Sequence, residues 1–230
     1  MSGILYLIPT PIGNLKDVSP RVIDSINDCE FLACEDTRNT QKLLSLLGLK
    51  KKLVSCHEHN ELEASQKIID SLLKGSNVGY VSDAGYPCIS DPGHLLVKEA
   101  IKNNIKIVPL SGPSAFISAL ISSSQDTSHF LFYGFLDSRS IKRKEEIKAL
   151  KDFPFTLIFY EAPHRINETL KDLYEILGNR EITIAREISK LHEEIYSTTL
   201  EQLVKNNNDF IGELVLFLDG NKEEKEKTDD

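Results

Sequence analysis

Short apolar runs alternate with amphipathic segments along the first half of the chain. The runs predict five buried strands, at residues 4–8, 31–34, 53–56, 77–81 and 105–110. Between them apolar residues recur at helical spacing, as Val22, Ile23 and Ile26 do after Ser19 and Pro20, a pair typical of a helix start. Strands that alternate with helices in this way indicate a parallel or mostly parallel α/β sheet.

The second half of the chain has more strand and fewer helical crossovers. Its pattern predicts a helix at 116–123 and strands at 129–135, 156–160, 182–185, 194–198 and 212–218. The polar segment 122–128 is expected to cross between two domains. We therefore expect an N-terminal, mostly parallel α/β domain over residues 1–113, a C-terminal mixed-sheet α/β domain over 114–220 and a disordered acidic tail over 221–230.

The stretch 81–93 carries more turn-forming residues than a plain connection needs. It holds two glycines, two prolines and two aspartates between a predicted strand and a predicted helix. The helix start is marked by Asp91 as N-cap and Pro92 at the first helical position. Because ligands of alternating strand–helix proteins bind at the carboxyl ends of the strands, we expect this loop to form one wall of a cofactor site.

The charge balance argues against a strongly basic nucleic-acid binder but leaves room for one basic patch. The formal net charge of the 230 residues is −8. Residues 137–151 nevertheless hold six basic side chains against three acidic ones, which suits a phosphate backbone. The four cysteines form no C-x-x-C pair, no apolar run reaches the length of a membrane span and no basic region precedes the first apolar run. These features favour reduced thiols and a cytoplasmic protein that does not enter a membrane.

Several common catalytic motifs are missing. The loop 9–15 has neither G-x-G-x-x-G nor G-K-[ST], and no G-x-S-x-G nucleophile elbow occurs. His57 and His59 are two apart and would share one face of a strand, as metal ligands can, but no third ligand is evident. A hydrogen-bonded loop pair is therefore favoured over a metal site, and no metal is expected.

Acidic residues recur at the predicted strand ends. Each of them suits a helix cap or a surface position when taken alone, but together they indicate one shared rim: Glu35, Asp36, Glu58, Glu161 and Glu187.

Ordered blocks that cover about residues 4–219 resemble the ribosomal RNA small-subunit methyltransferase I family of the tetrapyrrole-methylase superfamily. The blocks are PTPIGNL from Pro9, CEDTR from Cys34, HEHNE from His57, SDAGYPCISDPG from Ser82, PLSGPSA from Pro109, GFL from Gly134, YEAPHR from Tyr160 and ARE from Ala185. The chain departs from the family at Tyr86, where a threonine is common, and at Asp137, where a proline is common. Members of the family also continue well past the last predicted strand.

The resemblance implies two α/β domains of the tetrapyrrole-methylase type with S-adenosylmethionine in a cleft between them, and a homodimer. The implied activity is 2′-O-methylation of a cytidine ribose in small-subunit (16S) ribosomal RNA, free or in the assembled subunit. The implied cofactor residues are Pro11, Asp83, Ala84, Gly85, Ser111, Gly112, Pro113, Ser114, Tyr160, Ala185 and Gly212. The implied RNA-binding residues are Arg38, His57, His59, Arg139, Lys142, Arg143 and Arg165.

The implied reaction needs an aligned ribose hydroxyl and a group that receives its proton. The candidates for that group are Asp36, His57 and Glu161. Two other functions remain open. One is a related enzyme that methylates a tetrapyrrole or another small molecule, and the other is a non-catalytic RNA-binding module of ribosome assembly.

Overall fold

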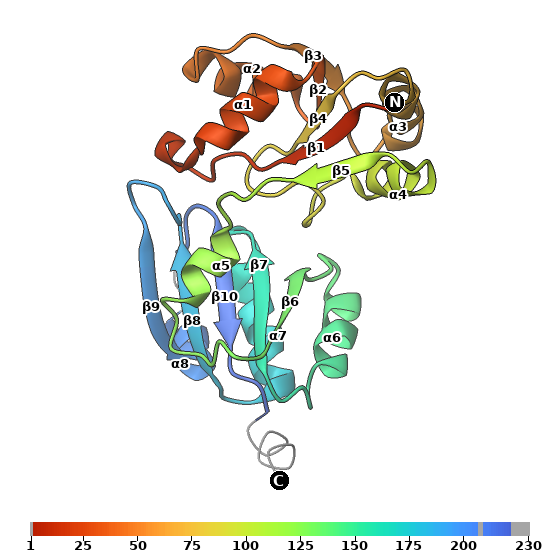
Figure 1. Cartoon of the computed structure of the whole chain (residues 1–230). Coiled ribbons are helices and arrows are strands. Elements are labelled where there is room, and N and C mark those ends of the chain that lie inside the picture. Colours follow the sequence, from red (N-terminus) through yellow and green to blue (C-terminus); the bar gives the residue numbers. More distant parts are fainter. Residues whose placement is uncertain (1, 207–208, 222–230) are drawn as a thin grey trace. The chain divides into compact units, whose positions relative to one another are not determined.

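The computed structural model describes residues 2–206 and 209–221 of the chain. It divides into two compact units, the first ending at Ser114 and the second beginning at Ala115, and both are α/β folds (Figure 1). The predicted acidic tail lies outside the described residues except for Asn221, whose backbone N–H donates to Phe153 O at 2.8 Å.

The first unit is built on a parallel five-stranded sheet in the order β3-β2-β4-β1-β5. Its strands are β1 (Ile4–Ile8), β2 (Phe31–Cys34), β3 (Lys52–Ser55), β4 (Val78–Val81) and β5 (Lys106–Pro109). The helices between them are η1 (Leu15–Asp17), a single 3₁₀ turn, and α1 (Pro20–Asp28), α2 (Thr37–Leu46), α3 (Glu61–Leu73) and α4 (His94–Lys102). The prediction of a parallel sheet with alternating helices is confirmed.

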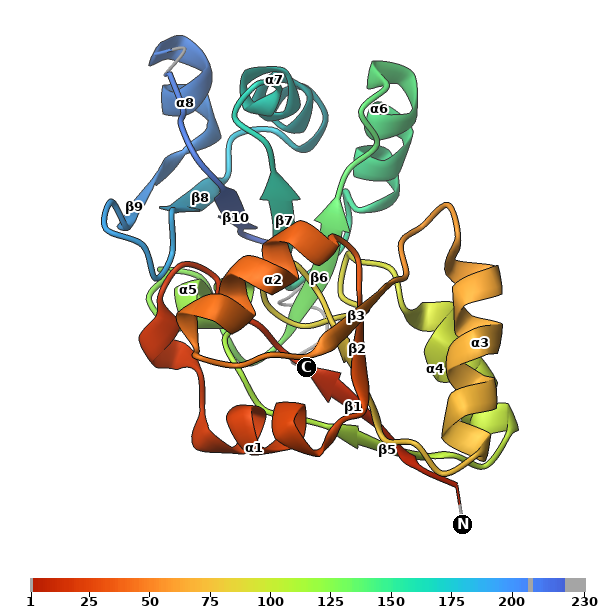
Figure 2. The same ribbon diagram turned by 90° about the horizontal axis from the view of Figure 1, so that it is seen from above.

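Helices cover both faces of this sheet (Figures 1 and 2). Alternate strand residues point to opposite faces, so β2 sends Leu32 and Cys34 toward α1 and α2, and Phe31 and Ala33 toward α3 and α4. Each face has its own apolar cluster. This explains why the central strands β2 and β4 are buried along their whole length rather than alternating, as is usual for a parallel sheet buried on both sides.

Two helix starts in this unit were predicted from the sequence, and one of them is wrong. Ser19 is the N-cap of α1 as predicted, and its Oγ accepts from Val22 N at 3.3 Å. Helix α4 begins instead at His94, after Gly93, whose φ is 119°. The carboxylate of Glu61 on α3 accepts from the N–H groups of Gly93 and Leu95, each at 2.9 Å, and so takes the capping role that the sequence suggested for Asp91.

The second unit is a mixed five-stranded sheet in the order β6-β7-β10-β8-β9. Only the β6–β7 pair is parallel, and the other three pairs are antiparallel, so the predicted mixed sheet is confirmed. The strands are β6 (Phe130–Phe135), β7 (Thr156–Glu161), β8 (Glu181–Arg186), β9 (Glu194–Thr199) and β10 (Leu214–Leu218). The helices are α5 (Ala115–Leu120), α6 (Ser140–Ala149), α7 (Ile166–Leu177) and α8 (Leu200–Asn206).

Helices α6, α7 and α8 cover one face of this sheet and α5 lies on the other (Figures 1 and 2). The segment 122–128, expected to cross between domains, belongs to this unit. Ser124 Oγ lies 3.2 Å from Thr183 Oγ1, and Thr156 Oγ1 donates to Asp126 O at 2.7 Å. The helix predicted over 116–123 ends at Leu120 because the chain turns there to make these contacts.

Among the described residues, no helix combines the length and the apolar character that crossing a membrane requires.

Candidate functional site

Three loops of the first unit meet at the carboxyl edge of its sheet, where they follow the neighbouring strands β4, β1 and β5. The backbones of Thr10 and Gly85 exchange two hydrogen bonds of 2.9 and 3.0 Å and form an isolated bridge between the loops after β1 and β4. Ser82 supports the bridge, since its Oγ donates to Gly85 O at 2.9 Å and its O accepts from Thr10 Oγ1 at 3.2 Å. The loop 81–93 is therefore fixed to its neighbour by several bonds.

The turn after β5 joins the same assembly through Gly112. Its N–H donates to the Tyr86 hydroxyl at 2.8 Å, and a Cβ on Gly112 would lie 2.3 Å from Pro9 Cγ. Only glycine allows this close approach to Pro9. The structure therefore brings together the predicted cofactor residues of this unit: Pro11, Asp83, Ala84, Gly85, Ser111, Gly112, Pro113 and Ser114. Their role as cofactor ligands stays a prediction.

Carboxyl groups gather at this edge, and two of them, Asp91 and Glu35, have a raised pKa. Burial, followed by the charges of Glu35 and Asp83, raises the pKa of Asp91 to about 6. Burial and the charge of Asp83 also raise the pKa of Glu35. Asp83 Oδ2 accepts from Asn39 Nδ2 of α2 at 2.7 Å. Because these carboxylates repel one another, the edge favours a ligand that carries positive charge.

Asp36 is the N-cap of α2. This is one of the two roles that the sequence suggested for it, the other being to receive the proton of the ribose hydroxyl. Its Oδ1 accepts from Arg38 N at 2.8 Å, and the Arg38 guanidinium binds both carboxylate oxygens. These bonds from Arg38 lower the pKa of Asp36 to about 2. A carboxylate held in this way is a weak proton acceptor at neutral pH.

His57 and His59 lie in the loop after β3 rather than on the strand. Their rings meet edge to face at 5.9 Å between centroids. His57 Nδ1 is buried and has no hydrogen-bond partner among the described residues. Within the same part of the chain, no group of three or more His, Cys, Asp or Glu side chains is arranged to hold a metal.

The second unit places its predicted cofactor residues on three strands or strand ends. Tyr160 is the second-last residue of β7, and its ring lies 5.0 Å from that of Phe132 and 5.5 Å from that of Phe135, between centroids. Ala185 is fully buried inside β8, so its methyl group belongs to the core. Gly212 precedes β10 with a φ of 86°. Their role as cofactor ligands also stays a prediction.

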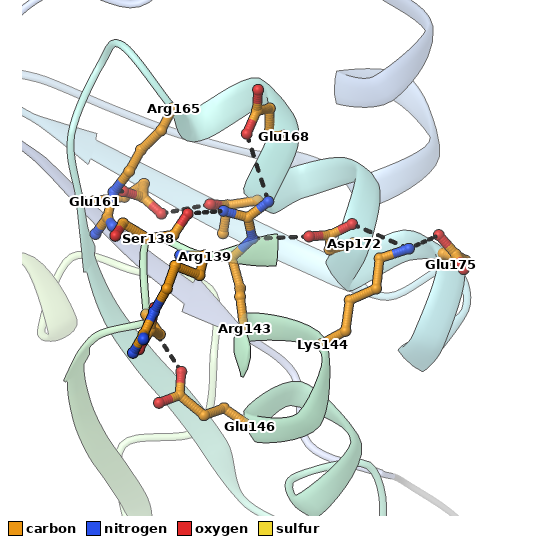
Figure 3. A network of polar contacts seen from close by, with 12 residues as sticks. Ser138, Arg139, Arg143, Lys144, Glu146, Glu161, Arg165, Glu168, Asp172 and Glu175 are labelled. Atoms are coloured by element: carbon orange, nitrogen blue, oxygen red, sulfur yellow. Dashed lines mark hydrogen bonds and ion pairs between the residues drawn. The ribbon is translucent and has the colours of Figure 1, made fainter. Parts of the chain in front are cut away.

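Glu161, a candidate proton acceptor, is buried and accepts several hydrogen bonds. It is 3% exposed, and it accepts from Ala162 N at 2.7 Å, from Thr169 Oγ1 at 2.6 Å and from Arg165 Nε at 2.5 Å (Figure 3). These bonds occupy both carboxylate oxygens. The geometry gives Glu161 the task of holding Arg165 rather than of receiving a proton.

The expectation that Arg143 contacts RNA is wrong for the described conformation. Its side chain is 2% exposed, its Nε donates to Asp172 Oδ2 at 2.8 Å and Glu168 lies 3.6 Å away, both on α7 (Figure 3). Arg143 joins α6 to α7 and cannot reach a ligand from there. By contrast, Lys142 is exposed, and Arg139 is 64% exposed while it pairs with Asp137 at 2.6 Å.

The structure adds supporting residues to those expected from the sequence. Tyr86 and Asn39 brace the first unit's loops. In the second unit, Glu187 has a φ of 53°, and its Oε1 accepts from Glu213 N at 2.9 Å. A Cβ on Gly212 would lie 2.4 Å from that oxygen, so Glu187 fixes the turn before β10. The ARE block pointed to Glu187, but only the fold pairs it with Gly212.

A pocket of about 210 Å³ lies at the other end of the second sheet. Thr156, Glu181 and Asp219 are among its lining residues, and none of the predicted site residues is. Thr156 is the first residue of β7, whereas Tyr160 and Glu161 are its last two residues. The pocket is therefore separate from the candidate site, and its carboxylates would repel a phosphate.

Comparison with known families matches residues 4–204 to the tetrapyrrole (corrin/porphyrin) methylases. Three curated relatives are all named ribosomal RNA small subunit methyltransferase I. The one from Halalkalibacterium halodurans is 45% identical over 97% of this chain and 78% of its own length. The one from Bacillus subtilis is 45% identical over 96% and 77%, and the one from Escherichia coli O157:H7 is 38% identical over 97% and 80%.

Among solved structures, the methyltransferase CobJ has a similar fold. It superposes with a TM-score of 0.70 over 95% of each chain, at 18% sequence identity. At that identity the likeness supports the two-unit α/β architecture and nothing finer.

Proposed function

This chain belongs to the ribosomal RNA small subunit methyltransferase I family of tetrapyrrole methylases, and from that premise we propose that it methylates small-subunit ribosomal RNA with S-adenosylmethionine. The finer proposal is transfer to the 2′-hydroxyl of a cytidine ribose. The observation that supports cofactor-dependent methyl transfer is the assembly of three loops at one sheet edge. In it, Thr10 is hydrogen-bonded to Gly85, and Tyr86 to Gly112. The homodimer implied by the family resemblance and the cytoplasmic location expected from the sequence stay predictions.

The loops after β1, β4 and β5 suit a cationic cofactor. Asp83 and Asp91 on the loop after β4, with Glu35 just after the neighbouring β2, supply negative charge, which complements the sulfonium and ammonium groups of S-adenosylmethionine. Gly85, with a φ of 77°, and Gly112 leave backbone groups uncovered by a side chain. When bound, the cofactor supplies an electrophilic methyl group. The task of these loops is then to fix its orientation.

Of the three candidate proton acceptors, His57 is the one we favour. Asp36 is held by Arg38, with its pKa lowered to about 2, and Glu161 is saturated by its donors. His57 is partly exposed, and its ring contacts that of His59 with no ion pair to hold it among the described residues. Because its Nδ1 is buried, Nε2 is the nitrogen that would receive a proton, and histidine is the commonest general base. We propose that the imidazole of His57 receives the proton of the ribose hydroxyl as the new bond forms.

Once Arg143 is removed and His57 is assigned to proton transfer, basic residues make up the rest of the RNA-facing set. It consists of Arg38, His59, Arg139, Lys142 and Arg165. Arg38 and Arg139 are 85% and 64% exposed and each pairs with one nearby aspartate, so part of each guanidinium stays available to a phosphate.

Methyl transfer from labelled S-adenosylmethionine separates this proposal from the two alternatives. The acceptors are purified small ribosomal subunits, naked small-subunit RNA and a tetrapyrrole precursor. We expect label in RNA from one or both RNA-containing acceptors and none in the precursor. Label in the precursor alone would support the small-molecule methylase. RNA binding without transfer to any acceptor would support the non-catalytic module.

A further inference from the structure

Strand β6 is an edge strand of the second unit and carries exposed aromatic rings. Phe130 is 39% exposed, Tyr133 36% and Phe135 52%. Single exposed apolar residues are ordinary, but an exposed ring that continues a cluster is less so. Phe135 continues the cluster in which Phe132 stacks on Phe116 at 4.3 Å and Tyr160 meets both Phe132 and Phe135.

A bulge in β6 places Phe135 on this cluster. Residues three apart on a regular strand point to opposite faces of a sheet, yet Phe132 and Phe135 both contact the Tyr160 ring. The register with β7 shifts between Phe132 and Gly134, and Gly134 has a φ of 82°. The extra residue turns Phe135 back to the face of Phe132, as bulges do where a side chain must be re-aimed.

Arg165 lies over the Phe135 ring, with its guanidinium carbon 5.8 Å from the ring centroid. It is 15% exposed and is held by Glu161, which is itself fixed by Ala162 N and Thr169 Oγ1 (Figure 3). A buried carboxylate thus holds a planar cation over an aromatic ring. We define this pair as the Phe135–Arg165 platform.

We propose that an unpaired base of the RNA substrate stacks on the Phe135–Arg165 platform. Single-stranded RNA is recognised by stacking of its bases on aromatic rings and guanidinium planes. The phosphates next to that base carry negative charge, which Arg165 and the exposed Arg139 and Lys142 at the start of α6 complement. Phe135 thereby becomes a residue that positions the RNA. The inference rests on the proposed function, because it takes RNA as the substrate.

The test compares the full-length protein with Phe135→Ala, Phe135→Tyr and the matched control Phe130→Ala, an exposed phenylalanine on the same strand without the Arg165 contact. The probe is a single-stranded RNA containing 2-aminopurine, whose fluorescence falls when the base stacks. Loss of one stacking ring is expected to weaken RNA binding about 5- to 150-fold in Phe135→Ala. Phe135→Tyr and Phe130→Ala should bind and quench as the wild type does.

Companion measurements decide between the outcomes. Calorimetry should give the same S-adenosylmethionine affinity for all variants, and the Phe135→Ala defect with small subunits should lie in KM rather than kcat. Quenching without methyl transfer by the wild type would keep the platform and refute the proposed function. Methyl transfer with an unchanged KM in Phe135→Ala would refute the platform alone. No quenching by the wild type, or loss of self-association rather than of RNA binding in Phe135→Ala, would also overturn the platform.

Discussion

The hydroxyl of Tyr86 accepts a hydrogen bond of 2.8 Å from the backbone N–H of Gly112. This bond joins the loop after β4 to the turn after β5, while Gly112 itself packs against Pro9 in the loop after β1. Tyr86 is a position at which the sequence departs from its family resemblance. In this chain the larger side chain spans two loops of the candidate site.

Tyr86→Phe should therefore weaken S-adenosylmethionine binding more than it weakens the fold. The lost bond is expected to cost about 0.5–1.5 kcal/mol of unfolding free energy, and the loosened turn to cost cofactor affinity as well. Calorimetry and urea unfolding measure the two effects. Tyr6→Phe is the matched control, because it removes a hydroxyl that donates to Asp28 at 2.7 Å in the same unit. Equal cofactor affinity in the two variants would show that the Tyr86 bond has no part in the site.

Arg143 and Lys142 are adjacent in sequence and should behave in opposite ways. Arg143→Met leaves Asp172 buried beside Lys144 alone, and breaking a buried pair costs about 3–5 kcal/mol. Lys142→Met changes an exposed side chain and should alter the unfolding free energy by less than about 0.5 kcal/mol.

For RNA binding, Lys142→Met should have the larger effect and Arg143→Met the smaller one. Lys142→Met is expected to reduce the salt dependence of RNA affinity, whereas folded Arg143→Met should keep it. Denaturant unfolding and RNA titrations at several salt concentrations test both. A stable Arg143→Met protein with weak RNA binding would restore Arg143 to the RNA-facing set.

Asp91 should make the protein less stable as the pH rises from about 4 to 6. Its pKa is raised to about 6 in the folded state, above an ordinary value of about 4, so the folded state binds more protons in that window. Asp91→Asn removes the titrating group, and its unfolding free energy should fall less over the window than that of the wild type. Asp24→Asn, an exposed change on α1, should follow the wild-type curve. Parallel curves for Asp91→Asn and the wild type would mean that Asp91 ionises without penalty.

The proton acceptor can be tested with variants that keep the local structure. His57→Gln should lower the single-turnover rate of methyl transfer about 10²- to 10⁴-fold, the usual contribution of a general base. Asp36→Asn keeps an N-cap residue of equal quality and should retain most of the rate. A full loss of rate in Asp36→Asn, with an unchanged rate in His57→Gln, would identify Asp36 rather than His57 as the proton acceptor.

Local signals in the sequence predicted the elements and several of the loops correctly. Ser19 and Pro20 start α1 because the cap and the capped N–H are three residues apart. Asp91 failed as a cap because Glu61, distant in sequence, occupies the N-terminus of α4. A local sequence pattern indicates only cap residues that are close to the helix start in sequence.

The same limit explains the misplaced site residues. The basic run 137–151 looks uniformly exposed in sequence, but Arg143 faces acids of α7 that lie far along the chain. Phe135 lies in the GFL block but was not predicted to be a site residue, because alternation along β6 does not reveal the bulge between Phe132 and Gly134. The residues that the family resemblance implied on the loops after β1, β4 and β5 do lie on loops that meet, because the carboxyl ends of parallel strands share one edge.

The central claim is methylation of a ribose hydroxyl in small-subunit RNA. Its most direct measurement is alkaline hydrolysis of RNA labelled by this protein from methyl-labelled S-adenosylmethionine. A 2′-O-methyl group removes the hydroxyl that alkali needs, so the label should appear in an alkali-resistant dinucleotide that contains cytidine. Label released in single nucleotides, or no label in RNA at all, would contradict the account.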